Sequence, residues 1–205
     1  MKNFALVALM LTIPASILAG WFNEPTPAYK QVPKEARIYL QDRNLKDLKQ
    51  VQELFKAGDI IDYVNLDRNE LEVFPEELLS LKGLKWLRLN DNKLTQIPTL
   101  DNLVNLRKIY LRDNNLTAVP EGLKNLPRLT DIDLSGNSKI KEVPEWLAKK
   151  EGLEHLSFSR TSIIRLPEDL SAWKSLKSLQ LGELNMSLNE MARIRAALSE
   201  TAIVF

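Results

Sequence analysis

The residues whose types and spacing could perform chemistry are the carboxylates between Asp131 and Glu142. The run DIDLSGNSKIKE fits the calcium-loop spacing D-x-D-x-S-G-x5-E when Ser135 is accepted at the fifth position. Asp131 and Asp133 could also form a carboxylate pair for general acid and base catalysis. Both hypotheses depend on the element that carries these side chains, because a calcium loop needs flanking helices and a catalytic pair needs a pocket and a partner group.

The composition excludes several other kinds of chemistry. The 205 residues contain no Cys and one His, His155, which excludes disulfide frameworks, thiolate metal sites, cysteine nucleophiles and His-rich metal or triad sites. Lys and Arg number 28 against 27 Asp and Glu, and loss of the first segment, with Lys2, would leave a neutral chain. A neutral chain lacks the electrostatic footprint of a general nucleic-acid binder. We therefore expect no nucleic-acid partner, no cofactor and no metal.

The first 20 residues, MKNFALVALMLTIPASILAG, have the build of a secretory signal peptide, with one Lys, an apolar run and then small residues. A transmembrane anchor is the alternative, but the apolar run is short, contains Pro14 and is not followed by a basic cluster. Cleavage after Ala19 or Gly20 would give a protein without a membrane span, secreted or retained in the periplasm or cell envelope. Residues 21–35 contain three Pro and are expected to form an extended lead-in.

From Ile61 the chain repeats itself with a period of 22 to 24 residues, which explains its 37 Leu residues. The units share the pattern LxxLxLxxNxLxx(I/V)P and begin at Ile61, Leu84, Leu106, Leu129, Leu153 and Leu176. The alternating Leu residues of LxxLxL face one side of a short strand, so the residues between them face the other side. In this register Ile132 and Leu134 must point inward. Alternation alone then explains Asp131 and Asp133, and it argues against both the calcium loop and the catalytic pair.

Asn and Pro recur at fixed positions of the repeat. A buried Asn can donate to and accept from the backbone as it turns out of the strand, so we expect a ladder formed by Asn69, Asn92, Asn114 and Asn137. Thr161 replaces Asn in the fifth unit and should weaken the ladder there, and one extra residue in SGNSKIKEVP should bulge the loop of the fourth unit. The recurring Pro has a fixed φ that suits the start of a short helix or an extended stretch.

This repeat resembles that of the leucine-rich-repeat family, in its exported bacterial form, over most of the chain from Ile61 to about Leu184. The resemblance implies an α/β fold, namely a curved right-handed horseshoe solenoid with a parallel sheet on its concave face. Residues 61–184 would form six repeats, the last of them incomplete.

Helical caps are expected at both ends of the array. Residues 36–60 read as a strand followed by an amphipathic helix that ends near Gly58. Residues 185–205 read as a capping helix, which opens with an S-x-x-E capping box at Ser187 and Glu190, followed by an edge strand. One apolar face of that helix is expected to contain Leu188, Met191, Ile194 and Leu198.

In this family, partners usually bind the concave face, which here exposes aromatic and basic residues in its N-terminal half. Aromatic residues and Arg are enriched at protein-binding hot spots. The alternatives are aromatics that merely favour strand formation, and an anionic glycan or nucleic-acid ligand, although Asp residues lie among the bases. The expected ligand-binding patch consists of Tyr63, Trp86, Arg88, Arg107, Lys108, Tyr110 and Arg112.

The sequence therefore predicts a monomeric, non-enzymatic, exported protein that binds a protein ligand through its concave sheet. Two other interpretations stay open, namely a structural, envelope-associated repeat protein and an inhibitor that plugs the active site of a secreted enzyme. Ubiquitin-ligase effectors with such repeats need a catalytic Cys, which this chain lacks.

Overall fold

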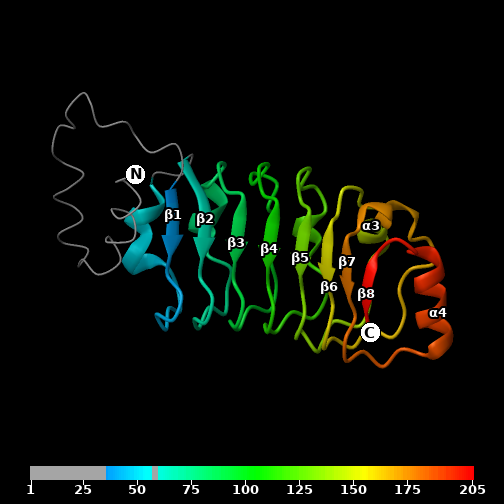
Figure 1. The fold of residues 1–205 in the computed structure, drawn as a ribbon. Helices are drawn as coiled ribbons and strands as arrows, with labels where there is room; N and C mark the ends of the chain where they lie inside the picture. The colour runs from blue at the N-terminus through cyan, green and yellow to red at the C-terminus, as the bar shows by residue number, and fades with distance from the viewer. Residues whose placement is uncertain (1–35, 57–59) are drawn as a thin grey trace, which may run out of the picture.

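The computed structural model describes residues 36–56 and 60–205. The predicted signal peptide and lead-in (1–35) and Gly58 lie outside the described residues. The described chain forms one parallel sheet whose eight strands follow one another in sequence order, side by side along a coil (Figure 1). The strands are β1 (Ala36–Tyr39), β2 (Ile61–Asn65), β3 (Trp86–Arg88), β4 (Lys108–Tyr110), β5 (Asp131–Asp133), β6 (His155–Ser157), β7 (Ser178–Gln180) and β8 (Ala202–Val204).

Each turn of the coil places equivalent repeat positions next to one another. Leu87 of β3 aligns with Ile109 of β4, which aligns with Ile132 of β5, and all three side chains are buried. Burying one such side chain contributes about 2 kcal/mol, and no single turn encloses its own apolar face. The inward residues of all turns therefore form one continuous core. The predicted solenoid with a parallel sheet on one face is confirmed.

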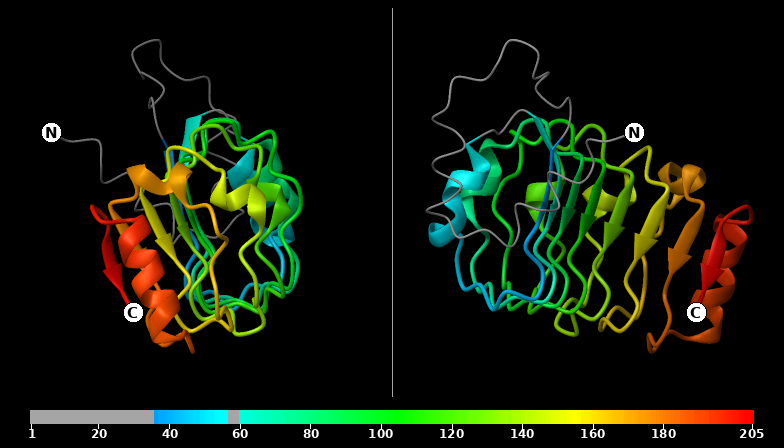
Figure 2. Two further views of the ribbon diagram at one scale, coloured as in Figure 1. Left: turned by 90° about the vertical axis from the view of Figure 1, so that its right-hand side faces the viewer. Right: turned by 60° about the vertical axis from the view of Figure 1, so that its left-hand side comes forward.

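The opposite side of the coil consists of short helices and extended segments (Figure 2). Pro75, Pro120 and Pro144 have extended backbone conformations and cap helices, whereas no helix begins directly after Pro98 or Pro167. Helices are wider than the spacing of about 4.8 Å between strands, so the coil curves toward the sheet. The helices are η2 (Lys49–Phe55), η4 (Glu76–Ser80), η5 (Glu121–Leu123), η6 (Ser171–Ser175), α3 (Glu145–Ala148) and α4 (Leu188–Ala197), where η marks a 3-10 helix.

The Asn side chains form the predicted ladder where the chain leaves the sheet. Asn92 Nδ2 donates to the carbonyls of Leu66 and Leu89 at 3.0 and 3.2 Å, and its Oδ1 accepts from the amide of Leu71 at 3.1 Å. Asn114 and Asn137 repeat this pattern one and two turns later. Each Asn thereby connects its own turn to the preceding one. Its side chain supplies hydrogen-bond partners for buried backbone groups of both turns.

The ladder ends at Thr161. Its hydroxyl donates to the carbonyl of Phe158 in its own turn at 2.8 Å, and the Leu134 carbonyl receives an amide hydrogen from Asn137 but none from the fifth unit. In each earlier unit the equivalent carbonyl accepts from two Asn residues, as the Leu89 carbonyl does. The ladder therefore has one bond fewer at the position where the sequence predicted it to be weaker.

We expect the substitution Thr161→Asn to raise the free energy of unfolding by about 1 kcal/mol, because it would restore the bond to the preceding turn. Urea denaturation of the two proteins measures this difference. Thr117→Asn, at an exposed position of the third unit, is the control and should change stability little. Equal effects of the two substitutions would contradict the ladder explanation.

The extra residue of the fourth unit is accommodated in a turn after β5. The Ile140 amide donates to the Asn137 carbonyl at 3.0 Å, which closes a turn over Ser138 and Lys139. Ile140 is still fully buried. The insertion therefore changes the loop, as predicted, and leaves the inward register intact.

The N-terminal cap differs from the prediction. The expected strand is present as β1, but the expected amphipathic helix is a 3-10 helix, η2, that begins only at Lys49. Leu45, the first apolar residue of the predicted helix, lies before η2, and its amide donates to Asn69 Oδ1 at 3.0 Å. The segment between β1 and η2 therefore donates backbone amide hydrogens to Asn69, which forms the first rung of the ladder. The helix begins only after this segment.

At the C-terminus, Ser187 Oγ accepts from the Glu190 amide at 3.2 Å, as the S-x-x-E spacing predicts. The Glu190 carboxylate is buried and accepts instead from the Leu166 amide at 2.9 Å and from Arg193 at 2.8 Å. The Arg193 guanidinium lowers the pKa of Glu190 below its usual value. Glu190 therefore joins α4 to the fifth unit rather than completing the capping box.

The apolar face predicted for α4 is wrong in one residue. Leu188 is 83% exposed, whereas Ile194 and Leu198 are buried. Leu188 lies six residues before Ile194, which places it about 120° away around a helix of 3.6 residues per turn. The polypeptide then continues into β8, which pairs with β7, and Ile203 and Phe205 pack against the core.

Candidate functional site

The outward positions of β1 to β4 form one surface on the N-terminal half of the concave face. Parallel pairing aligns Arg37 with Tyr63, Tyr63 with Trp86 and Trp86 with Lys108. Two residues further along each strand, Arg88 aligns with Tyr110. The repeat spacing thus brings together side chains that are more than 20 residues apart in sequence.

Three aromatic side chains lie in a row across β1, β2 and β3. The ring centroids of Tyr39 and Tyr63 are 5.2 Å apart, and those of Tyr63 and Trp86 are 6.0 Å apart with an edge-to-face geometry. Burial by its neighbours raises the pKa of the Tyr63 hydroxyl, whereas Trp86 is 42% exposed. We call Tyr39, Tyr63 and Trp86 the aromatic row. It offers a large apolar surface that is ordered before any ligand arrives.

Cations lie over the rings of this surface. The Lys108 ammonium is 5.1 Å from the Trp86 ring centroid, and the Arg88 guanidinium is 5.4 Å from that of Tyr110. At such distances a cation is attracted by the ring quadrupole, by about 0.5–1 kcal/mol at exposed sites. These contacts fix the orientation of flexible basic side chains on the sheet.

The same cations are also paired with buried carboxylates. Arg88 binds Asp67 at 2.5 Å, and Lys108 binds Asp131 at 2.9 Å. The hydrogen bond to Asp131 raises the pKa of Lys108 above its usual value. The surface that the sequence suggested to be basic is therefore close to neutral, because each of these positive charges has a negative partner from the neighbouring strand region.

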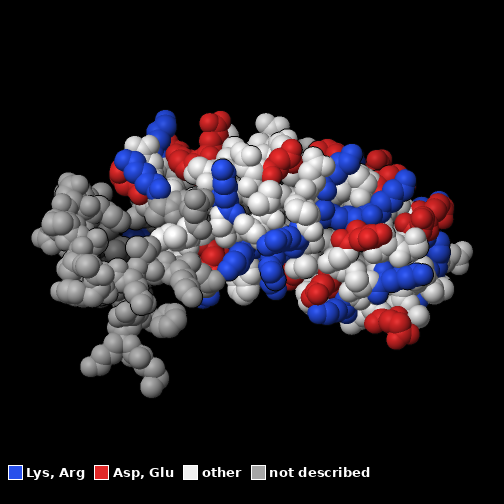
Figure 3. Space-filling model, turned by 90° about the horizontal axis from the view of Figure 1, so that it is seen from above, with Lys and Arg blue, Asp and Glu red and all other residues white. Residues whose placement is uncertain are grey.

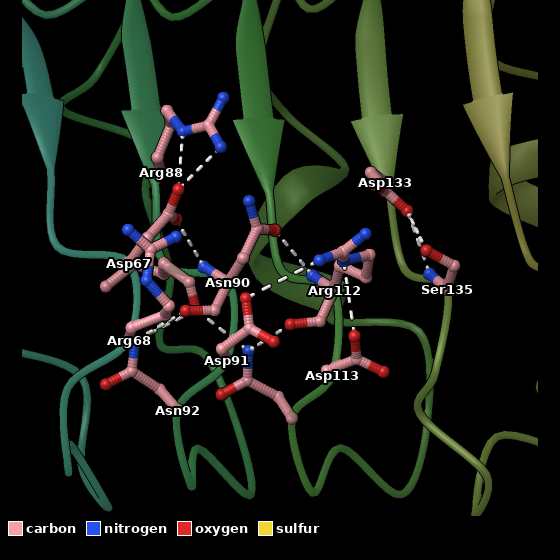
Figure 4. Close-up of polar contacts among 12 residues, drawn as sticks. Asp67, Arg68, Arg88, Asn90, Asp91, Asn92, Arg112, Asp113, Asp133 and Ser135 are labelled. Atoms are coloured by element: carbon pink, nitrogen blue, oxygen red, sulfur yellow. Dashed lines mark hydrogen bonds and ion pairs between the residues drawn. The ribbon is translucent and has the colours of Figure 1, made fainter. Parts of the chain in front are cut away.

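Arg112 lies beyond β4, where the strands end, within a row of charges shown in Figure 4. It pairs with Asp91 at 3.6 Å and with Asp113 at 3.2 Å. Asp113 also pairs with Arg160, which is 47 residues later and two turns away, at 3.0 Å. The intervening turn carries Gly136 at this place, where a Cβ would lie 1.9 Å from Asp113 Oδ1. The absence of a side chain there lets the ion pair cross a whole repeat.

The structure places five predicted patch residues on strands, namely Tyr63, Trp86, Arg88, Lys108 and Tyr110. Arg112 lies at the end of the sheet, and Arg107 lies apart from the other predicted patch residues. Arg107 precedes β4, its backbone pairs with Lys85 and Thr130, and its side chain is exposed at the other end of the strands. Position two of the repeat lies before the strand begins, so its side chain does not join the outward row.

Two residues of the surface, Arg37 and Tyr39, were missed at the sequence level. They belong to β1, which was assigned to the cap and not to the binding face. The Arg37 guanidinium is 6.0 Å from the Tyr63 ring centroid. Alternation was the available signal, because inward Ile38 and Leu40 require Arg37 and Tyr39 to point outward.

The carboxylates that suggested chemistry have structural partners. Asp131 is buried against Lys108 and accepts from the Thr130 hydroxyl at 2.6 Å, and Asp133 accepts from the amide and hydroxyl of Ser135. His155 is half-buried, with Nδ1 2.9 Å from Ser178 Oγ. In the described part of the chain, no group of three or more His, Cys, Asp or Glu side chains could hold a metal ion.

The described residues also include no helix that is long and apolar enough to cross a membrane.

Trp173 is fully buried on the convex side, and its indole donates to the Leu147 carbonyl at 2.8 Å. Trp146 is half-buried there and donates to Glu121. Of the three Trp side chains described, Trp86 is the one on the concave face.

Comparison with known proteins agrees with this architecture. Two sequence models match the chain, one described as leucine rich repeat over residues 61–116 and one as leucine rich repeats in two copies over residues 104–148. Human lumican is 33% identical over 146 residues, which cover 67% of this chain and 40% of lumican. Keratocan of Danio rerio is 30% identical over 145 residues, which cover 68% of this chain and 40% of keratocan.

Solved structures of bacterial proteins are similar as well. A leucine-rich-repeat protein of Leptospira interrogans has a TM-score of 0.69 and 27% identity, over 82% of this chain and 48% of that protein. An internalin of Listeria monocytogenes has a TM-score of 0.64 and 21% identity, over 77% of this chain and 46% of that protein, a likeness of fold. This chain spans less than half the length of each of these four proteins.

The repeat pattern, the parallel sheet, the ladder and these matches lead to one conclusion. The chain belongs to the leucine-rich-repeat family.

Proposed function

We propose that this protein is an exported, non-enzymatic binding module that holds a protein ligand on the N-terminal half of its concave sheet. The observation that carries the proposal is the aromatic row, with a partly exposed Trp86 whose ring is flanked by Tyr63 and covered in part by Lys108. Trp, Tyr and Arg dominate protein-binding hot spots. A protein partner accords with the typical role of leucine-rich-repeat proteins.

The electrostatics of the surface favour a protein over a polyanion as its ligand. Arg88 and Lys108 are neutralised by Asp67 and Asp131, so little net field would attract an anionic polymer to this face. Paired charges around an apolar centre instead match the usual anatomy of a protein interface, which has an apolar core and a polar rim. Tyr110 and Arg112 would belong to that rim.

Export is proposed from the sequence of residues 1–20, which has the charge, length and small residues of a signal peptide. The proposed location is the periplasm, the cell envelope or the medium. The protein would act there as a monomer.

We expect the double substitution Tyr63→Ala and Trp86→Ala to weaken partner binding by at least about 30-fold, equivalent to about 2 kcal/mol, because two adjacent anchors of the surface are removed. Immobilised protein first captures partners from envelope or host extracts. The affinity of each identified partner for both proteins is then measured by surface plasmon resonance.

The matched control is Val73→Ala with Ile164→Ala, which removes two exposed apolar side chains away from the concave face. It should leave the affinity unchanged. Thermal denaturation would show that both variants are folded. If a partner bound the aromatic-row variant as tightly as the original protein, this surface would be excluded as its binding site.

A further inference from the structure

A second surface follows the other edge of the sheet, where the chain returns from the convex side and enters each strand. It is formed by residues 79–85, 101–107, 124–130, 148–154 and 171–177, which we call the basic edge. These five segments contain nine Lys and Arg residues and three Asp and Glu residues. Figure 3 looks down on this edge, and Lys and Arg side chains extend across its middle.

The excess of positive charge is confined to the basic edge. Residues 36–205 contain 25 Lys and Arg and 25 Asp and Glu, so the positive charge of the basic edge is balanced by acids elsewhere. Four of these acids lie together on the first convex segment, at Glu70, Glu72, Glu76 and Glu77. Residues 36–205 are therefore neutral in total and asymmetric in their charge distribution.

Most of the cations on the basic edge are exposed and available. Lys82, Arg107 and Lys174 are exposed, and Arg128 is exposed with one hydrogen bond to the Asn105 side chain at 2.7 Å. Lys150 is different, because its ammonium is half-buried and donates to the carbonyls of Lys124 and Leu126. Burial lowers the pKa of Lys150. Two cations of the basic edge are paired with carboxylates, Lys177 with Glu154 at 2.7 Å and Lys85 with Asp62 at 3.7 Å. The other exposed cations contrast with Arg88 and Lys108 of the concave face, which buried Asp residues neutralise.

Each of the five segments contributes at least one Lys or Arg, at differing positions of the repeat. Successive turns are about 4.8 Å apart along a sheet, so these side chains are distributed along the length of the coil. Of the exposed large hydrophobic side chains in the described part of the chain, Val104 alone falls in these segments, and none there is aromatic. The surface is therefore a charged strip without an apolar anchor.

We propose that the basic edge binds a linear acidic polysaccharide lying along the coil. An extended chain with anionic groups along its length can contact cations of several successive turns at once. Single-stranded nucleic acid is less suited, because its binding sites combine cations with aromatic stacking platforms. A membrane surface is less suited too, because peripheral helices add an inserted apolar face to their basic residues. This surface is separate from the aromatic row.

The test measures binding to heparin, used as the probe for an acidic polysaccharide, over a range of salt concentrations. The charge-reversal variant carries Lys82→Glu, Arg107→Glu and Arg128→Glu, three exposed residues of three consecutive turns. The matched control carries Lys46→Glu, Lys139→Glu and Lys141→Glu, which change the net charge equally at exposed positions outside the basic edge. The original protein should bind at low salt, with affinity falling as salt rises.

The edge variant should bind heparin at least about 100-fold more weakly, with a salt dependence reduced by the loss of about three ionic contacts. The control and the Tyr63→Ala, Trp86→Ala variant should bind as the original does, so failure of this proposal is distinguishable from failure of the protein-binding proposal. Equal losses in the edge and control variants would overturn the site. Tighter binding of DNA duplexes or anionic lipid vesicles than of heparin would overturn the ligand class, and no heparin binding at low salt would overturn both.

Discussion

Replacing Asn137 with Ala should lower the free energy of unfolding by about 3 kcal/mol. The side chain is fully buried, donates to the carbonyls of Leu111 and Leu134 at 2.9 and 2.8 Å, and accepts from the Leu116 amide at 3.1 Å. The substitution would leave these three backbone groups with fewer partners in a place that water does not reach, and each such buried group costs about 1–3 kcal/mol. Urea denaturation followed by Trp fluorescence measures the change.

Asn115→Ala is the control, because Asn115 has the same side chain in the neighbouring unit but is exposed. It should change stability by less than about 0.5 kcal/mol. A loss at Asn137 no larger than that at Asn115 would show that the ladder contributes nothing to stability.

The ladder was predictable from the sequence because every turn has the same buried backbone groups that need hydrogen-bond partners. A chain that leaves a buried strand has backbone groups to satisfy, and one Asn at a fixed distance from Leu87, Ile109 or Ile132 can satisfy them in each turn. Alternation of Leu sets which side faces the core. Five in-phase units made the inward positions and the outward rows readable from the sequence.

The missed features are those in which a local residue departs from the repeat. β1 was not recognised as a further outward-facing strand because Arg43 stands where the following units carry the ladder Asn. The apolar spacing is otherwise that of the repeat, since Leu40 and Leu45 correspond to Leu66 and Leu71. Leu188 was assigned to a buried face because it lies three residues before Met191, but it is the first residue of α4. Helical geometry placed it on the exposed side.

Ion pairing of the candidate site could not be read from the sequence for a different reason. Asp67 had several cations within possible reach, and its pairing with Arg88 depends on rotamers and on burial by the adjacent turn. Arg160 reaches Asp113 only because Gly136 leaves space between them. The sequence predicted which charges share a surface but not which of them cancel, and Arg88 and Lys108 of the concave face are cancelled by buried carboxylates.

Replacing Gly122 with Ala should lower the free energy of unfolding by about 3 kcal/mol or more. A Cβ at this position would lie 1.9 Å from the Pro98 carbonyl oxygen and 2.8 Å from the carbonyl carbon, both backbone atoms of the preceding turn. No side-chain rotation can relieve this contact, so the second and third units would have to separate. Strain from added volume in a packed interior costs about 1–3 kcal/mol and occasionally more, and this contact is with rigid backbone.

The sign of the effect makes the Gly122 prediction diagnostic, because Gly→Ala in a helix normally stabilises a protein by up to about 1 kcal/mol. Gly152→Ala is the control. Gly152 has a φ of +77°, and a Cβ added there would have nothing within 4 Å. Ala at this position should therefore cost about 1 kcal/mol of backbone strain and no more. Urea denaturation of both variants separates steric clash from backbone strain. A Gly122→Ala protein as stable as the original would mean that the second and third units are not packed as closely as the 1.9 Å contact requires.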